Sequence, residues 1–244
     1  MPGPVLEICV ADNPSLEAAI TGGANRIELC SALELGGLTP TPGLLRVAAS
    51  SPIPVYAMVR PRSGDFVFSE ADRAVMLAEI DAIAEAGLAG VVLGASLPDG
   101  SLDTETLGHL AERARAHQLG TTLHRAFDLV PDIAEAVEAA SALGFERILT
   151  SGRAARAIDG VGDIALAHQC AQGRLAIMAG SGIAPDVVRA IRSRAPLDEW
   201  HASCGTSQPQ SAAAVSLGFT APERRSTEVE SVKALRRALD ALVR

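Results

Sequence analysis

The sequence contains few aromatic residues and no long uninterrupted apolar segment. Phe, Trp and Tyr make up 3% of the 244 residues, although 48% of the residues are hydrophobic. A core of this chain must therefore consist mainly of Ala, Val, Leu and Ile, a composition that suits parallel strands covered by helices. No apolar run reaches the roughly 18 residues of a membrane span, and the first residues lack the basic start of a signal peptide. We therefore expect a cytoplasmic protein without a membrane partner.

Basic residues are also in deficit. The chain has 21 Lys and Arg residues against 29 Asp and Glu residues, which gives a net charge of −8. This balance argues against nucleic acid as a partner, because nucleic-acid binding needs basic surfaces. A small anionic ligand stays compatible with it, because local charge can oppose net charge. The four cysteines, Cys9, Cys30, Cys170 and Cys204, form no C-x-x-C pair, and we expect free thiols in the cytoplasm.

The dominant pattern is an alternation of short β-rich segments with segments of helical spacing. The predicted strands are Val5–Val10, Arg26–Cys30, Val55–Arg60, Gly90–Gly94, Thr121–Ala126, Arg147–Ser151, Leu175–Gly180 and Glu199–Ser203. Eight similar units in a chain of this length predict an α/β fold, a single (β/α)8 TIM barrel over residues 1–244. An open, doubly wound parallel sheet is the alternative.

The helices carry several recognisable end signals, and Pro185 and Asp186 are expected to begin the seventh helix. Ser69 and Asp72 are spaced as a cap pair for a helix over Ser69–Ala86. After the last strand, residues 205–226 are rich in Ser, Ala, Gln and Gly, and we expect an irregular segment that is either an ordered lid or a mobile loop. A final helix is expected over 227–243, with Thr227 and Glu230 spaced as a capping box.

Charged residues and cysteines gather at the C-terminal ends of the predicted strands, where barrels place their active sites. Residues two apart in a strand share a face, so Glu7 lies on the side of Cys9, and Glu28 on the side of Cys30. The first two strands are neighbours, which predicts two carboxylates and two thiols side by side. The candidate partners of these carboxylates are Arg60, Arg62, Arg125, His124 and His201. The alternative interpretation is a buried ion-pair network that only fills the barrel.

A second local signal follows the seventh strand. Gly180, Ser181 and Gly182 would let backbone N–H groups approach an anion, with the N-terminus of the next helix adding a favourable dipole. Barrels often bind phosphate near this position. A tight turn that simply requires glycine is the alternative.

Together these strand ends resemble the CutC family. The matching segments are Leu6-Glu7-Ile8-Cys9, Arg26-Ile27-Glu28-Leu29-Cys30, Gly36-Gly37-Leu38-Thr39-Pro40, Arg60-Pro61-Arg62-Ser63-Gly64-Asp65-Phe66, His124-Arg125-Ala126-Phe127-Asp128, Leu149-Thr150-Ser151-Gly152 and Met178-Ala179-Gly180-Ser181-Gly182. The resemblance implies a TIM barrel, a cytoplasmic location and a role in copper homeostasis. It also implies copper(I) as the bound metal, with Cys9 and Cys30 as its ligands, but it assigns no enzymatic reaction.

One departure from the family pattern follows the eighth strand. Family members tend to carry a basic residue in the stretch that aligns with residues 208–214, and this chain has none there. If that residue contacts a ligand, the ligand site of this chain is altered.

Two functional hypotheses result. The first is a copper(I)-binding protein that uses Cys9 and Cys30. The second is an enzyme acting on a small anionic or phosphorylated metabolite, with acid–base residues among Glu7, Glu28 and His124. Its substrate-binding residues would be Arg60, Arg62, Asp65, Arg125, Asp128, Gly180, Ser181, Gly182 and His201. A barrel that has lost its site and acts as a binding partner is a third option. A homodimer is compatible with the fold, although no apolar stripe in the sequence predicts one.

Overall fold

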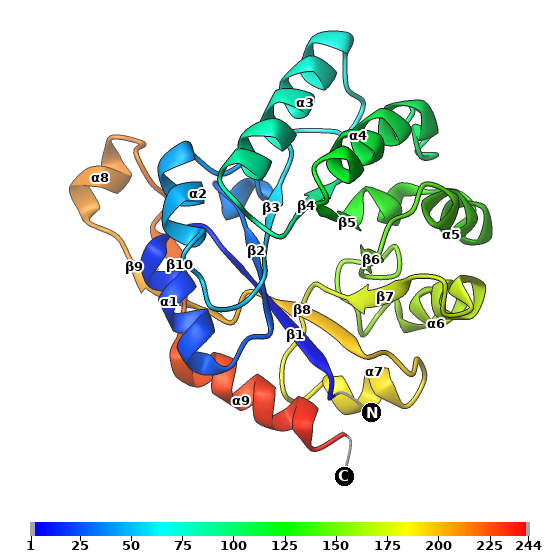
Figure 1. Cartoon of the computed structure of the whole chain (residues 1–244). Coiled ribbons are helices and arrows are strands. Elements are labelled where there is room, and N and C mark those ends of the chain that lie inside the picture. The colour runs from blue at the N-terminus through cyan, green and yellow to red at the C-terminus, as the bar shows by residue number, and fades with distance from the viewer. Residues whose placement is uncertain (1–2, 243–244) are drawn as a thin grey trace.

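The computed structural model describes residues 3–242, and its eight parallel strands form a closed barrel (Figure 1). The strands are β1 (Val5–Val10), β2 (Arg26–Leu29), β3 (Val55–Met58), β4 (Gly90–Leu93), β5 (Gly120–Leu123), β6 (Arg147–Thr150), β7 (Ala176–Ala179) and β8 (Glu199–Ala202). Strand β8 pairs in parallel with β1, with Val5 opposite Glu199. This closing pair confirms the predicted TIM barrel and excludes the open sheet.

Helices surround the barrel on the outside (Figure 1). They are α1 (Asn13–Gly22), α2 (Pro42–Ala48), α3 (Glu70–Glu85), α4 (Thr104–Ala116), α5 (Ile133–Ala142), α6 (Val161–Ala171), α7 (Val188–Arg192) and α9 (Val229–Asp240). The predicted cap pair is confirmed at α3, where Ser69 and Asp72 bond each other's backbone N–H groups. In residues 3–242, no helix is long and apolar enough to cross a membrane.

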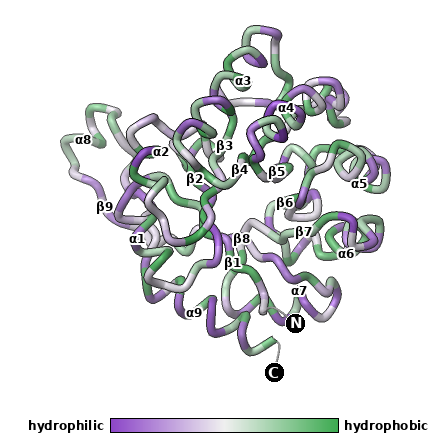
Figure 2. Tube along the Cα trace, in the orientation of Figure 1, coloured by the Kyte–Doolittle hydropathy of each residue, from purple (hydrophilic) through white to green (hydrophobic). Residues whose placement is uncertain are grey.

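The core lies between the strands and the helices. Along β1, Leu6, Ile8 and Val10 are fully buried in one continuous apolar cluster with helix residues, whereas the alternate residues Glu7 and Cys9 face the barrel interior. Figure 2 shows the same division on α9, whose trace alternates between hydrophilic and hydrophobic residues. The apolar side of α9 packs against α1, where Gly22 leaves room for Val232.

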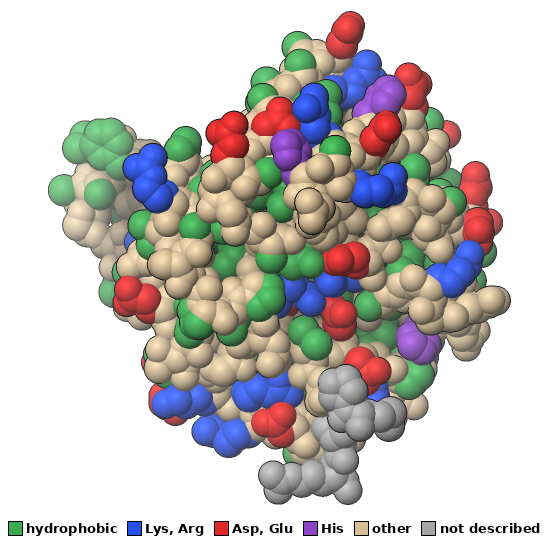
Figure 3. All heavy atoms as spheres, viewed as in Figure 1, with side chains coloured by type: hydrophobic (Ala, Val, Ile, Leu, Met, Phe, Trp, Pro, Cys, Tyr) green, Lys and Arg blue, Asp and Glu red, His purple; other side chains and the backbone are tan. Residues whose placement is uncertain are grey.

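The C-terminal segment after β8 differs from the expectation. Where an irregular segment was predicted over 205–226, the chain forms an antiparallel ribbon of β9 (Gly205–Pro209) and β10 (Glu223–Thr227), joined by α8 (Ala212–Ser216). Backbone hydrogen bonds between β9 and β10 hold this ribbon together. Its strands therefore do not require alternating apolar residues, which is why the sequence pattern did not predict them. An ion pair between Arg224 and Asp12 ties it to the start of α1. Figure 3 shows hydrophobic side chains on the part of the surface that projects at the position of α8. Leu217 and Phe219, which follow α8, are exposed.

Two helix starts are also corrected. Thr227 does not cap the last helix, because it ends β10 and its hydroxyl donates a hydrogen bond to the Ser203 carbonyl. Helix α9 starts at Val229 without a side-chain cap. The predicted end of this helix at Val243 lies outside the described residues. The seventh helix begins at Val188, after the predicted start at Pro185 and Asp186.

A layer of ion pairs fills the barrel below the mouth. Glu199 bridges the guanidinium groups of Arg26 and Arg147, and both arginines lie over the ring of Tyr56. Arg147 also donates a hydrogen bond to the Thr122 hydroxyl at 2.9 Å. For this layer, the alternative interpretation of the charged residues applies, because its ion pairs form a buried network that fills the barrel. The layer forms the floor of the barrel mouth.

The close contact between the start of α6 and the end of β6 can be tested by substitution. A Cβ added at Gly160 would lie 2.1 Å from the Ser151 carbonyl oxygen, whereas a Cβ at Gly162 would have nothing within 4 Å. We expect Gly160→Ala to lower the free energy of unfolding by about 2 kcal/mol, because the backbone must shift. Gly162→Ala should raise it by up to about 1 kcal/mol, because Ala favours the helix. Urea denaturation measures both, and equal stabilities would contradict this contact.

Candidate functional site

The mouth of the barrel is organised around the carboxylate of Glu7. This side chain is fully buried on β1, where it forms an ion pair with Arg26 and accepts a hydrogen bond from Nδ1 of His201 at 2.8 Å. The register of the strands explains both contacts, because Glu7 lies opposite Arg26 of β2 and opposite His201 of β8. Glu7 therefore fixes the ring of His201 and leaves its Nε2 atom free for another partner.

Charge sets the protonation states of this pair. Burial alone would raise the pKa of Glu7, but the charge of Arg26 and the hydrogen bond from His201 lower that pKa to about 2. Burial would likewise lower the pKa of His201, but the charge of Glu28 and the hydrogen bond to Glu7 raise it well above its ordinary value. The arrangement thus holds an ionised carboxylate against a protonated imidazole.

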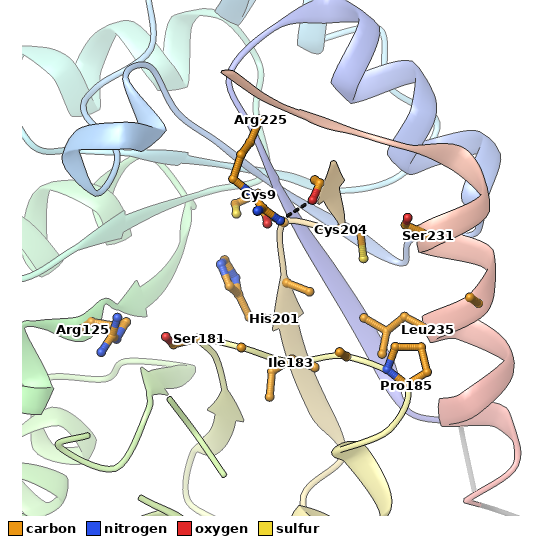
Figure 4. Close-up of a pocket in the computed structure, with 16 residues that line it drawn as sticks. Cys9, Arg125, Ser181, Ile183, Pro185, His201, Cys204, Arg225, Ser231 and Leu235 are labelled. Carbon is orange, nitrogen blue, oxygen red and sulfur yellow. Dashed lines mark hydrogen bonds between the residues drawn. The ribbon is translucent and has the colours of Figure 1, made fainter. Parts of the chain in front are cut away.

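Three side chains from three strands meet next to this pair. Ligand atoms of Cys9, Glu28 and His201 all lie within 4.8 Å of one another, and all three residues are buried. The Nε2 atom of His201 is 3.7 Å from a carboxylate oxygen of Glu28. Figure 4 shows the His201 ring pointing toward Cys9. A thiol, an imidazole and a carboxylate at such distances form a donor set for a metal ion.

Cys30 occupies a different position from the one that the sequence suggested. Cys9 lies opposite Glu28 in the β1–β2 register, so Cys30 stands two residues further along. It is not part of the group of three ligand atoms. Its thiol donates to a Glu28 oxygen at 3.6 Å and packs with Tyr56, Met58 and Val92. Burial, and then the negative charge of Glu28, raise its pKa well above the ordinary value.

A cavity of about 190 Å³, here called the inner cavity, opens beside this group. Arg60 and His124 line it together with Cys9, Glu28 and His201. The guanidinium of Arg60 and the ring of His124 both contact the ring of Phe66, at 4.9 Å and 4.7 Å between centres. Burial, and then the charge of Arg60, lower the pKa of His124 to about 3, so His124 is neutral near pH 7.

A larger cavity of about 680 Å³, here called the outer cavity, continues toward the surface. Cys9, Arg125 and His201 line both cavities. The ribbon contributes Arg225, and the loop after β7 contributes Ser181 and Gly182. The sulfur of Cys204 also lines this space, but in Figure 4 it points away from Cys9, toward α9. Burial raises the pKa of Cys204 to about 11.

Asp128 and Arg125 connect two strand ends. Arg125 forms an ion pair with Asp128 at 2.7 Å and donates a hydrogen bond to the Ser151 hydroxyl. Asp128 also accepts hydrogen bonds from the Thr150 hydroxyl and from the backbone N–H of Ser151. Asp128 therefore fixes the loop after β6, while Arg125 is placed at the junction of the two cavities.

Other predicted residues lie away from the inner cavity. Arg62 and Asp65 form an exposed ion pair with each other at 3.1 Å, and neither lines the two cavities. Gly180 lies at the end of β7, where its N–H bonds the Thr150 carbonyl. Because α7 begins only at Val188 and has five residues, no helix dipole reaches the loop at Ser181 and Gly182.

Sequence reasoning missed two residues that line the outer cavity, Arg225 and Cys204. Arg225 lies in the segment that was expected to be irregular, and its position follows from the register of the ribbon, where it pairs with Ser207. A weak signal existed, since two short polar segments flank the apolar residues of α8. Phe66, which fixes Arg60 and His124, was part of a recognised segment but was not assigned a role.

Comparisons with known proteins agree with this architecture. A model of the CutC family matches residues 4–206. The family protein CutC from Rhizobium meliloti is 55% identical over 97% of this chain and 96% of the relative. The corresponding protein from Caulobacter vibrioides is 48% identical over 95% of this chain and 97% of the relative. A crystal structure of CutC from Streptococcus agalactiae, described as a candidate copper homeostasis protein, is 28% identical, with a TM-score of 0.77 over 82% of this chain and 98% of that chain.

The ionised state of Glu7 predicts how stability depends on pH. The pKa of Glu7 falls from 4.5 to about 2 in the folded protein, so its contribution is present above pH 4.5 and is lost as the pH falls toward 2. A shift of this size corresponds to about 3 kcal/mol. Urea denaturation across this pH range should show the loss in the wild type and a flatter profile in Glu7→Gln. The exposed Glu112→Gln is the control, and a wild-type profile as flat as that of Glu7→Gln would contradict the ion pair.

Proposed function

The chain belongs to the CutC family, and from this premise we propose that it is a cytoplasmic copper(I)-binding protein that acts in copper homeostasis. The observation that carries the proposal is the buried group of Cys9, Glu28 and His201, whose ligand atoms lie within 4.8 Å of one another. The description of the Streptococcus agalactiae CutC as a candidate copper homeostasis protein supports the choice of metal.

The chemistry of these donors suits copper(I). A thiolate is a soft ligand, and imidazole binds copper readily. Cys9 and the free Nε2 atom of His201 would hold the ion, because Nδ1 of His201 is engaged by Glu7. Glu28 is a hard oxygen donor and would act mainly through its negative charge next to the cation. Cys9 also lines both cavities, which gives the ion a path from the surface.

The thiols support the proposed location. Cys9, Cys30, Cys170 and Cys204 are all free, and the cytoplasm keeps such thiols reduced. The role of Cys30 differs from that of Cys9 because its thiol is fully buried and bonded to Glu28. We therefore propose Cys9 as the thiolate ligand of the metal. Cys30 would not bind the metal directly but would position Glu28 through its hydrogen bond.

Single cysteine variants test this assignment. Titration of reduced protein with Cu(I) against a competing chelator should show an affinity that falls about a hundredfold or more in Cys9→Ser, because the soft ligand is lost. Cys30→Ser should lose about tenfold or less, because it acts through Glu28. Cys170→Ser, on α6 and outside both cavities, is the matched control and should bind as the wild type does.

The outcomes separate three interpretations. If Cys9→Ser and Cys30→Ser lose equal Cu(I) affinity, the two thiols are both ligands, and the proposed site of one thiol and one imidazole is wrong. Unchanged affinity in Cys9→Ser would contradict copper binding at the barrel mouth. Preferential binding of Zn²⁺ under the same conditions would contradict the choice of metal.

Protonation of His201 gives an independent prediction. The pKa of His201 lies well above its ordinary value because of the nearby charge of Glu28, so the ring must release a proton before Nε2 can bind a metal. Cu(I) affinity should therefore rise as the pH increases from about 6 to about 8. The number of protons released per Cu(I), measured by calorimetry in two buffers, should fall by about one in His201→Gln. Equal proton release in the two proteins would exclude His201 as a ligand.

A further inference from the structure

The inner cavity contains polar atoms that lack partners. Seven buried side-chain nitrogen or oxygen atoms among residues 3–242 have no hydrogen-bond partner, and three of them belong to residues that line this cavity. These three are Oε1 of Glu28, Nε of Arg60 and Nε2 of His124. Buried polar atoms in proteins are normally paired, so their concentration in one cavity makes this cavity a candidate binding site for a polar ligand.

Arg60 brings a positive charge to this cavity without a counter-ion. Its terminal nitrogens donate hydrogen bonds to the backbone carbonyls of Leu35, Gly37 and Gly64. Within the described part of the chain it forms no ion pair with a carboxylate, and the residue is 5% exposed. Buried charges are normally paired, and the other buried arginines, Arg26 and Arg147, each bind a carboxylate. Arg60 is therefore suited to a negatively charged ligand.

His124 adds a second donor with a fixed direction. Its Nδ1 atom accepts a hydrogen bond from the backbone N–H of Ala126 at 3.1 Å, so the proton of the neutral ring lies on Nε2. The ring is 3% exposed and contacts Phe66, which also contacts the guanidinium of Arg60. One aromatic ring thus packs against both side chains, so little ordering of these side chains is needed when a ligand binds.

We propose that the inner cavity binds the carboxylate group of a small organic acid, with Nε of Arg60 and Nε2 of His124 as the donors. One cation and two N–H groups suit the single charge and two oxygens of a carboxylate. A volume of about 190 Å³ admits an acid of a few carbon atoms. A phosphate group is disfavoured because it carries up to two charges, and Glu28 already lines the same cavity.

This site goes beyond metal binding and does not depend on it. Arg60 lies in the connection between β3 and α3, and His124 lies between β5 and the short 3-10 helix η2 (Arg125–Leu129), whereas the proposed copper ligands belong to β1 and β8. The two sites face one space, because Cys9, Glu28 and His201 line the inner cavity as well. An acid bound to Arg60 and His124 would therefore lie beside the thiol of Cys9 and the carboxyl group of Glu28.

The test uses glycolate as the probe and metal-free, reduced protein. Binding of sodium glycolate is measured by calorimetry and by ligand-observed NMR, with sodium chloride at equal ionic strength as the reference and inorganic phosphate as a competing probe. His124→Asn keeps an acceptor for the Ala126 N–H and removes the Nε2 donor. Arg60→Lys keeps the charge and removes the Nε donor. Arg62→Lys changes an exposed arginine outside both cavities and is the matched control.

We expect saturable glycolate binding in the wild type and in Arg62→Lys, and an affinity at least about tenfold lower in His124→Asn and in Arg60→Lys, or about 1.4 kcal/mol. Thermal melting checks that each variant is folded. No saturable binding to the wild type, equal binding in a folded His124→Asn, or tighter binding of phosphate than of glycolate would each overturn the proposal. Because no copper is present, these results are independent of the Cu(I) titration.

Discussion

The structure of the barrel mouth depends on the ion pairs that the buried carboxylate of Glu7 forms with Arg26 and His201. A charge at this depth is tolerated only when it is paired and hydrogen-bonded, and Arg26 and His201 meet that requirement from the two neighbouring strands. Arg26 also forms an ion pair with Glu199, and Glu199 forms another with Arg147. The floor of the cavity is therefore one connected network of ion pairs. Glu7 also fixes the orientation of the His201 ring, so that its Nε2 atom faces Cys9 and Glu28.

The register between β1 and β2 decides which of the potential ligands meet. Cys9 lies opposite Glu28, so one thiol joins the carboxylate and the imidazole, while the other thiol stands further along and packs with Tyr56, Met58 and Val92. Two cysteines that look equivalent in the sequence therefore have different surroundings. Cys9 is placed at the junction of the two cavities, and Cys30 is enclosed beside Glu28.

Charge is divided across the mouth. One side carries Glu28 and the ionised Glu7 around the protonated His201, and the other carries Arg60 and the neutral His124. On the second side, the ring of Phe66 packs against both the Arg60 guanidinium and the His124 ring. The proposed copper ligands lie on one side of this space and the proposed carboxylate donors on the other. The two proposals together would account for more of these ionisable groups than the metal alone, which needs only two of them.

The sequence by itself determined the β/α alternation, the capping of α3 and the strand ends at which Glu7, Glu28, Arg60 and His124 gather, because these depend on local periodicity and on a general rule of barrels. It predicted a barrel but left an open sheet as the alternative, and only the pairing of β8 with β1 excluded that alternative. It did not determine the ribbon over 205–227, which depends on backbone pairing between segments distant in sequence. Nor did it separate Cys9 from Cys30 or Arg60 from Arg62. Those distinctions depend on strand register and on which side chains become buried together, and only the tertiary structure decides both.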